Sequence, residues 1–198
     1  MNTALIEETI AAALGAPVRV AIEHASDAGA YDPVDDHLLG RRALARALTA
    51  AGRRADEVTT WPCAFASVSH SRGTAVAVAL PRGERARGIG VDLERDRPVR
   101  PGLAGVFCDA RERAWLDTVP AAERDATVLR LWTAKEALYK ADAAQGDAIV
   151  AEYGVDVPAL ERGGRGAART TRLTTLRIGD ASLSVALAPE EHHVESTR

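Results

Sequence analysis

The chain contains little cysteine: among its 198 residues only Cys63 and Cys108 occur. Two isolated cysteines cannot form a disulfide framework, and their spacing does not match a zinc site. The N-terminus MNTALIEETIAAALG lacks the basic start and apolar core of a secretion signal, and no apolar run is long enough to cross a bilayer. These absences predict a soluble protein of the reducing cytoplasm with no membrane partner.

A basic excess is also missing, since the formal net charge is −3. Proteins that bind nucleic acids normally concentrate positive charge on one face, so this class of partner is not expected. Aromatic residues make up only 4% of the chain, whereas 46% of residues are hydrophobic, enough to fill a core. Each tryptophan is therefore expected to anchor a particular packing site. The three are Trp61, Trp115 and Trp132.

Hydrophobic periodicity indicates an α+β protein. Helical patterns cover residues 3–14, 35–51, 108–119 and 122–143. Alternating patterns typical of strands cover residues 17–24, 65–68, 74–80, 88–95, 172–179 and 181–188, and the stretch SHSRG is expected to form a turn. Two of these strands, TAVAVAL and SLSVALA, have similar patterns and each ends a hairpin. We therefore predict two similar α+β lobes in one chain, a pseudo-dimer, comprising residues 1–95 and 96–198.

The strand GIGVDLER, Gly88 to Arg95, alternates apolar residues on one face with Gly90, Asp92 and Glu94 on the other. Two adjacent carboxylates repel each other, so the simplest interpretation is an edge strand whose acidic face meets water. Gly90 argues against this interpretation, because a glycine inside a strand often marks a close approach to the backbone. A cation that binds both acids is the alternative.

The longest helical pattern contains LWTAKEALYKA, in which Trp132, Glu136 and Lys140 are spaced four residues apart and share one helix face. Lysine is scarce here, and arginine is the usual cation of the chain. Glu136 and Lys140 could form an ordinary helical ion pair worth about 0.3–0.5 kcal/mol. Alternatively, Glu136 is a third acid that meets a cation.

Together, GVDLE and WTAKEALYK resemble the 4′-phosphopantetheinyl transferases, and WPCAFASVSHSRG and GRRALARAL extend the resemblance. The size is similar to the larger, single-chain, two-lobed type, including the activators of surfactin and siderophore synthetases. The resemblance implies magnesium-dependent transfer of the phosphopantetheine arm of coenzyme A to a serine of an apo acyl, aryl or peptidyl carrier protein or carrier domain, with release of 3′,5′-ADP. Such carriers serve siderophore, polyketide and nonribosomal peptide synthesis.

The resemblance also implies roles for individual residues. Asp92, Glu94 and Glu136 would bind Mg²⁺, with Mn²⁺ as a substitute, and hard cations do prefer carboxylate oxygens. The residues expected to contact coenzyme A are Arg41, Arg42, Ser69, His70, Lys135 and Lys140. Glu136 is the expected general base, with Glu112 as an additional candidate. The active site would lie at the seam between the lobes, so that a monomer is sufficient.

Simpler alternatives remain for several of these residues. His70 could cap a turn, and Arg41, Arg42 and Arg46 could form a solvated helix face. Where the family often has a further basic residue, this chain has YDPVDDHLLG, and Arg53 or Arg54 could replace it. The Gly- and Arg-rich stretch GGRGAARTTR could be a surface loop that faces an acidic carrier. At the level of function, the alternatives are a metal-dependent phosphohydrolase and a non-catalytic protein that binds coenzyme A or a carrier.

Overall fold

The computed structural model describes residues 2–25, 33–157, 166–168 and 171–190. Its seven strands are β1 Arg19–His24, β2 Ala66–Ser71, β3 Thr74–Ala79, β4 Ala86–Arg95, β5 Gly166–Ala168, β6 Thr171–Ile178 and β7 Ala181–Pro189. The helices are α1 Thr3–Leu14, α2 Pro33–Ala50, α3 Leu103–Phe107, α4 Ala110–Leu116 and α5 Ala121–Ala141, with short 3₁₀ helices η1 Ala55–Glu57 and η2 Val150–Glu152. In these ranges, no helix has the length and apolar character needed to span a bilayer.

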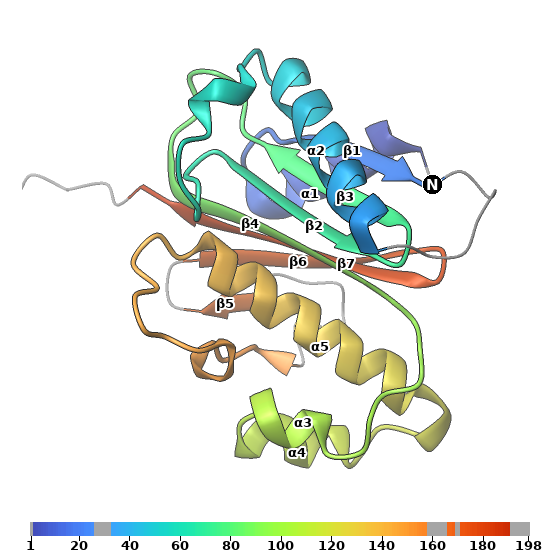
Figure 1. Ribbon diagram of the computed structural model, residues 1–198. Helices are drawn as coiled ribbons and strands as arrows, with labels where there is room; N and C mark the ends of the chain where they lie inside the picture. Colours follow the sequence, from blue (N-terminus) through green and yellow to red (C-terminus); the bar gives the residue numbers. More distant parts are fainter. Residues whose placement is uncertain (1, 26–32, 158–165, 169–170, 191–198) are drawn as a thin grey trace, which may run out of the picture.

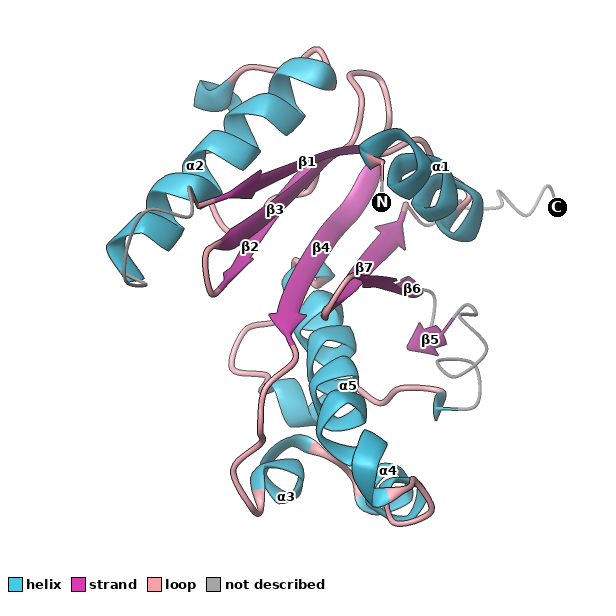
Figure 2. Cartoon of the chain, turned by 90° about the vertical axis from the view of Figure 1, so that its right-hand side faces the viewer, coloured by secondary structure: helices cyan, strands magenta, loops and turns pink. Residues whose placement is uncertain are grey.

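The strands form two antiparallel sheets, one in the order β1-β3-β2 and one in the order β4-β7-β6-β5. Helix α2 covers the outer face of the first sheet and α5 covers the outer face of the second (Figures 1 and 2). Helix α1 packs with the inner faces of both sheets. The protein therefore has the predicted α+β architecture with two lobes, each consisting of a sheet and a long outer helix.

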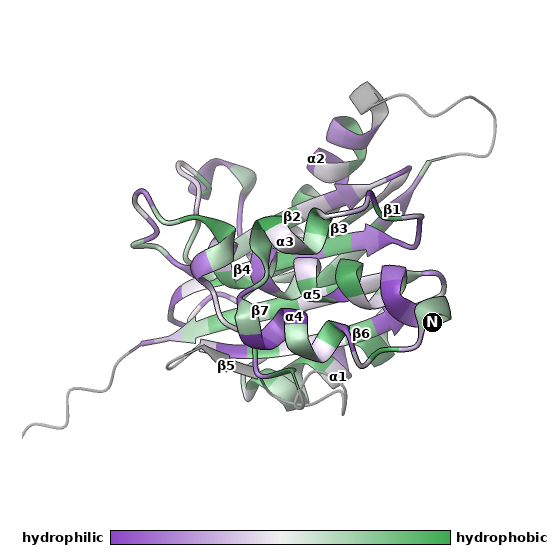
Figure 3. Cartoon of the chain, turned by 90° about the horizontal axis from the view of Figure 1, so that it is seen from below, coloured by the Kyte–Doolittle hydropathy of each residue, from purple (hydrophilic) through white to green (hydrophobic). Residues whose placement is uncertain are grey.

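Alternation along the strands separates the apolar layers. In β3, Val76 and Val78 point to the inner core shared with α1, while Ala75, Ala77 and Ala79 face α2. Helix α1 contributes Ile6, Ile10 and Leu14 at four-residue intervals to the inner core. Hydrophobic colour accordingly runs through the layer of strands in Figure 3. Small residues on the outer faces allow the long helices to approach closely.

Helix α5 lies unusually close to β4. A Cβ atom added at Gly90 would lie 2.0 Å from the carbonyl oxygen of Ala137, and one added at Gly88 would lie 2.0 Å from that of Ala141. The group that approaches the backbone at Gly90 is therefore helix α5. Strand β4 is the edge strand of its sheet, as expected, but its acidic face does not meet water, because β2 covers this edge and Asp92 is buried.

Strands β2 and β4 meet at the seam between the sheets through serine hydroxyls. The hydroxyls of Ser67, Ser69 and Ser71 accept hydrogen bonds from the backbone N–H groups of Val91, Leu93 and Arg95, at 3.0, 3.3 and 3.4 Å respectively. These serines occupy alternate positions of β2, so all three point to the same side. The stretch SHS thus lies on a strand and does not form the expected turn, which the chain makes at Arg72 and Gly73.

Most predicted elements match the observed ones within a few residues, including the long helices and the final hairpin. Strand β4, which ends at Arg95 just before the predicted boundary, pairs with β7 of the second sheet. The stretch GGRGAARTTR lies largely outside the described residues, which include only Gly166–Ala168 as β5 and the start of β6.

The contact at Gly90 generates a prediction about stability. Gly90→Ala should lower the free energy of unfolding by about 3 kcal/mol, because the new methyl group meets backbone atoms that cannot rotate away. The matched control is Gly105→Ala in α3, where an added Cβ would meet nothing within 4 Å and stability should change little. Equal urea denaturation midpoints for both variants would contradict the packing argument.

Candidate active site

A pocket of about 730 Å³ opens at the seam between α2 and α5. Its floor is formed by β2 and β4, which carry Ser69, His70 and Asp92. The complete lining is His37, Gly40, Arg41, Leu44, Ala55, Val58, Trp61, Val68, Ser69, His70, Asp92, Trp132, Glu136 and Lys140. The pocket thus brings together residues from both halves of the sequence, including the predicted stripe of α5.

Asp92 is the most buried acid of the pocket, at 6% exposure. Its Oδ1 accepts hydrogen bonds from the ammonium of Lys140 at 2.7 Å and from the hydroxyl of Ser69 at 2.8 Å. Its other oxygen, Oδ2, is buried and has no hydrogen-bond partner. Since a buried carboxylate oxygen without a partner is costly, Asp92 retains the capacity to bind one more cation or donor.

Glu136 lies one helical turn before Lys140, and its Oε2 is 4.0 Å from the lysine ammonium. Burial raises the pKa of Glu136, and the negative charges of Asp92 and Glu94 raise it further, although Lys140 acts in the opposite direction. Burial is the largest of these contributions, so the charged form of Glu136 is less favourable here than at an exposed position. A raised pKa also makes this carboxylate a better proton acceptor than an exposed glutamate.

Glu94 follows Asp92 on the same face of β4, but it does not line the pocket. Its Oε2 accepts hydrogen bonds from Ser71 at 3.1 Å and from Arg97 at 2.7 Å. Arg97 and Lys140 thus contact carboxylate oxygens of Glu94 and Asp92 that a metal ion would need as ligands. Within the residues the structure describes, no three His, Cys, Asp or Glu side chains form a ready-made metal site.

Helix α2 supplies the opposite wall of the pocket. His37, Arg41 and Leu44 lie on one face of the helix and line the pocket, whereas Arg42 is exposed and is not part of the lining. Arg46 forms an ion pair with Glu23 of β1. Of the three arginines considered from the sequence, Arg41 is therefore the one that faces the pocket.

Glu112 and Lys135 form a separate buried ion pair, with Oε2 and Nζ 2.8 Å apart and exposures of only 1% and 0%. Glu112 also accepts hydrogen bonds from the backbone N–H groups of Asp109 and Val155. Neither member of the pair lines the pocket. The structure thus places both residues where they connect α4, α5 and the segment before Val155, away from Asp92 and Glu136.

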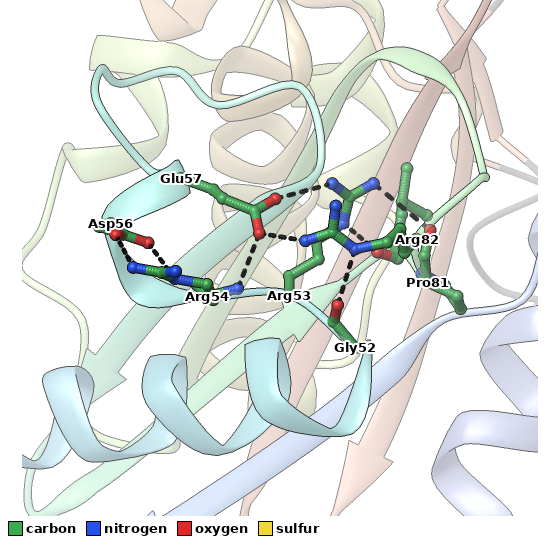
Figure 4. A network of polar contacts seen from close by, with 8 residues as sticks. Gly52, Arg53, Arg54, Asp56, Glu57, Pro81 and Arg82 are labelled. Atoms are coloured by element: carbon green, nitrogen blue, oxygen red, sulfur yellow. Dashed lines mark hydrogen bonds and ion pairs between the residues drawn. The ribbon is translucent and has the colours of Figure 1, made fainter.

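The remaining wall is largely apolar and consists of Ala55, Val58 and Trp61 on the loop after α2. A polar network holds this loop in place (Figure 4). Glu57 forms ion pairs with Arg53 and Arg82, and Arg53 also donates to the carbonyl oxygen of Leu80 at 2.7 Å.

Arg54 pairs with Asp56 in the same loop, so both arginines considered as replacements for a missing basic residue make contacts within the loop. Neither Arg53 nor Arg54 lines the pocket. Their contribution is to fix the wall that carries Trp61.

The tryptophans differ in their environments. Trp132 packs edge-to-face on Phe107, with centroids 5.0 Å apart, and also lines the pocket. Trp115 packs against the core beneath α5. Trp61 is 54% exposed, so the expectation that it anchors a packing site is wrong. Its presence in the pocket lining was missed, and so was that of His37, which four-residue spacing from Arg41 could have revealed.

The contact between Lys140 and Asp92 generates a second prediction. Lys140→Met should lower the free energy of unfolding by about 1–3 kcal/mol, because the buried Asp92 carboxylate loses its cation. The double variant Asp92→Asn with Lys140→Met should recover much of this loss, since no charge is then left unpaired. Chemical denaturation of the four proteins in the cycle measures the coupling. Additive effects would show that the two side chains do not depend on each other.

Comparison with known families matches residues 88–181 to the model of the 4′-phosphopantetheinyl transferase superfamily. A comparison with curated proteins finds no match. The matched segment includes β4, α5 and β6, and therefore Asp92, Glu136 and Lys140 of the pocket. The acidic wall of this pocket thus lies in the segment that is similar to the 4′-phosphopantetheinyl transferase superfamily.

Proposed function

We propose that this protein transfers the 4′-phosphopantetheine arm of coenzyme A to a serine of an apo carrier protein of the acyl, aryl or peptidyl type. The observation that carries the proposal is the pocket at the seam, which joins the acids and lysine of the superfamily segment to Arg41 and His70. A site built from both lobes of one chain needs no second copy, so we propose a monomeric enzyme of the larger, two-lobed type with lobes at residues 1–95 and 96–198.

The apolar part and the basic part of the pocket lining both suit coenzyme A as the substrate. An apolar wall with an exposed tryptophan suits the adenine ring, because aromatic side chains stack on bases. Arg41, His70 and Lys140 supply donors for phosphate groups, and arginine in particular matches phosphate geometry. A volume of about 730 Å³ falls within the range of small-molecule sites.

Asp92, Glu94 and Glu136 are the residues that would hold Mg²⁺ or Mn²⁺. The unpartnered Oδ2 of Asp92 and the nearby carboxylates of Glu136 and Glu94 fit a hard divalent cation, which takes carboxylate oxygens. When bound, the cation would neutralise charge on the pyrophosphate. For Asp92 and Glu94 to serve fully as ligands, Lys140 and Arg97 must move away from the oxygens that they now contact.

In the proposed reaction, the serine oxygen of the carrier bonds to the β-phosphorus of coenzyme A, the phosphoanhydride bond breaks and 3′,5′-ADP leaves. Glu136 would accept the proton of the serine hydroxyl, a role suited to its raised pKa. Lys140 would exchange Asp92 for a phosphate oxygen, while His70 and Arg41 hold the nucleotide end. Catalysis then rests mainly on orientation and on charge neutralisation.

A mass measurement tests the proposal against its rivals. The protein is incubated with MgCl₂, coenzyme A and an apo carrier protein, and the carrier is then weighed. A gain of one phosphopantetheine group is the expected result. Hydrolysed coenzyme A with an unchanged carrier would indicate a phosphohydrolase, and no change in either molecule would indicate a protein that only binds.

Variants of the acids give the third prediction. Asp92→Ala and Glu136→Ala should each reduce the transfer rate at least about 100-fold, because each removes a ligand that the proposed cation needs. The fold should persist, since the other carboxylates then repel each other less. Asp125→Ala, an exposed acid of the same helix α5, is the matched control and should transfer at the wild-type rate. Near-normal turnover by either pocket variant would refute the proposed role of these acids.

The fourth prediction concerns Arg41. Arg41→Ala should raise KM for coenzyme A about tenfold or more while changing KM for 3′-dephospho-coenzyme A little, because the guanidinium would bind the 3′-phosphate. Arg42→Ala removes the same charge one residue further along, outside the pocket lining, and should have a much smaller effect. If the two substrates respond equally to Arg41→Ala, the 3′-phosphate binds elsewhere.

A further inference from the structure

Two imidazoles meet at the rim of the pocket. His37 of α2 and His70 of β2 pack edge-to-face with their ring centroids 4.9 Å apart, and both line the pocket. Arg41 lies one helical turn after His37 on the same face of α2. The three side chains thus form a corner at which N–H donors of two imidazoles and one guanidinium can converge on one anion.

Gly40 lies at the contact between α2 and β2. A Cβ atom at this position would lie 3.6 Å from Cδ2 of His70 and 3.5 Å from Cγ2 of Val68. A methyl group would therefore just fill the space between α2 and the His70 ring, while a longer side chain would not fit. A larger residue at this position would push the helix, and with it His37 and Arg41, away from the strand.

Asp36 of α2 lies next to the ring of His70. Its side chain is only 3% exposed, and its Oδ1 accepts a hydrogen bond from the backbone N–H of Gly73 at 2.8 Å. The other oxygen, Oδ2, lies 3.8 Å from Nδ1 of His70, which is an ion-pair contact and not a hydrogen bond. Because Nδ1 faces this fixed carboxylate, Nε2 on the opposite side of the ring is directed away from Asp36.

We propose that His37 is a direct ligand of a dianionic phosphate monoester of the substrate, acting with His70 and Arg41, and that Asp36 is the positioning residue of His70. The inference rests on the proposed function and deepens it, since it assigns this group to the 3′-phosphate of coenzyme A. A dianionic monoester accepts several hydrogen bonds at once, which suits one guanidinium and two imidazoles. Among the described residues of α2, those that line the pocket are His37, Gly40, Arg41 and Leu44, none of which is acidic.

Calorimetry with two small nucleotides tests this without metal, carrier or turnover. The probes are 3′,5′-ADP and 5′-AMP, which differ only in the 3′-phosphate. The wild-type protein should prefer 3′,5′-ADP, and His37→Ala should weaken that ligand about 5- to 20-fold while changing the affinity for 5′-AMP less than twofold. Leu38→Ala, at the next and also exposed position of α2, is the control and should bind as the wild type does. Unchanged preference in His37→Ala would overturn the assignment.

A second variant tests the role of Asp36. Asp36→Asn should raise KM for coenzyme A severalfold at nearly constant kcat and should change the ¹⁵N shifts of the His70 ring, because the ring loses its fixed partner. Unchanged ring shifts would overturn the positioning role. If this buried substitution prevents folding, His37→Ala still decides the assignment, since its side chain lies at the surface.

The failure of this inference can be separated from the failure of the proposed function. A wild-type protein that modifies the carrier, together with a His37→Ala variant that keeps the nucleotide preference, would refute only the inference. If the wild-type protein leaves the carrier unmodified while the His37→Ala variant loses the preference for 3′,5′-ADP, only the proposed transferase activity would be refuted. In that case the corner would still be a phosphate monoester site.

Discussion

The approach of α5 to β4 is the contact on which the site depends. Gly88 and Gly90 leave room for the carbonyl oxygens of Ala141 and Ala137, so the helix backbone rests directly on the strand. At this separation the side chain of Lys140 reaches not only Asp92 but also the carbonyl oxygen of Val91, at 3.3 Å. Larger residues at the two glycines would lift the helix from the strand and separate these partners.

The serine contacts between β2 and β4 serve two purposes. A hydroxyl can accept one hydrogen bond and donate another, and Ser69 and Ser71 do both: each accepts from a backbone N–H of β4 and donates to a carboxylate, Asp92 or Glu94. The same side chains therefore join the two lobes and orient the acids. An alanine would satisfy neither the N–H nor the carboxylate, so the seam and the acidic wall are coupled through these hydroxyls.

The extent to which the sequence predicts this arrangement varies with the range of the interaction. The shared helix face of Trp132, Glu136 and Lys140 follows from spacing alone, and the structure shows all three in the pocket lining. Local alternation likewise predicts that Asp92 and Glu94 share one face of β4. These features depend only on the geometry of a single helix or strand.

Local sequence patterns do not predict which distant segments of the chain contact each other. Gly90 correctly signalled a close approach, but only the packing of α5 reveals what approaches. The burial of Lys135 depends on Glu112, 23 residues earlier on another helix, and its position next to Glu136 gave no hint of this. Similarly, the spacing of Arg53 and Arg54 from the pocket residues does not show that the loop uses them for its own ion pairs.

Lys135 and Lys140 are the only lysines in the chain, and both contact carboxylates. Lys135 is fully buried, and its partner Glu112 is also held by two backbone N–H groups, so separation would leave charges stranded in the core. Lys140 is 29% exposed and borders the pocket. An ammonium on a flexible stem can turn to a new anion without the planar geometry that arginine requires. The difference in burial therefore makes Lys135 a fixed tie between helices and leaves Lys140 as the cation that can change partners when a ligand enters the pocket.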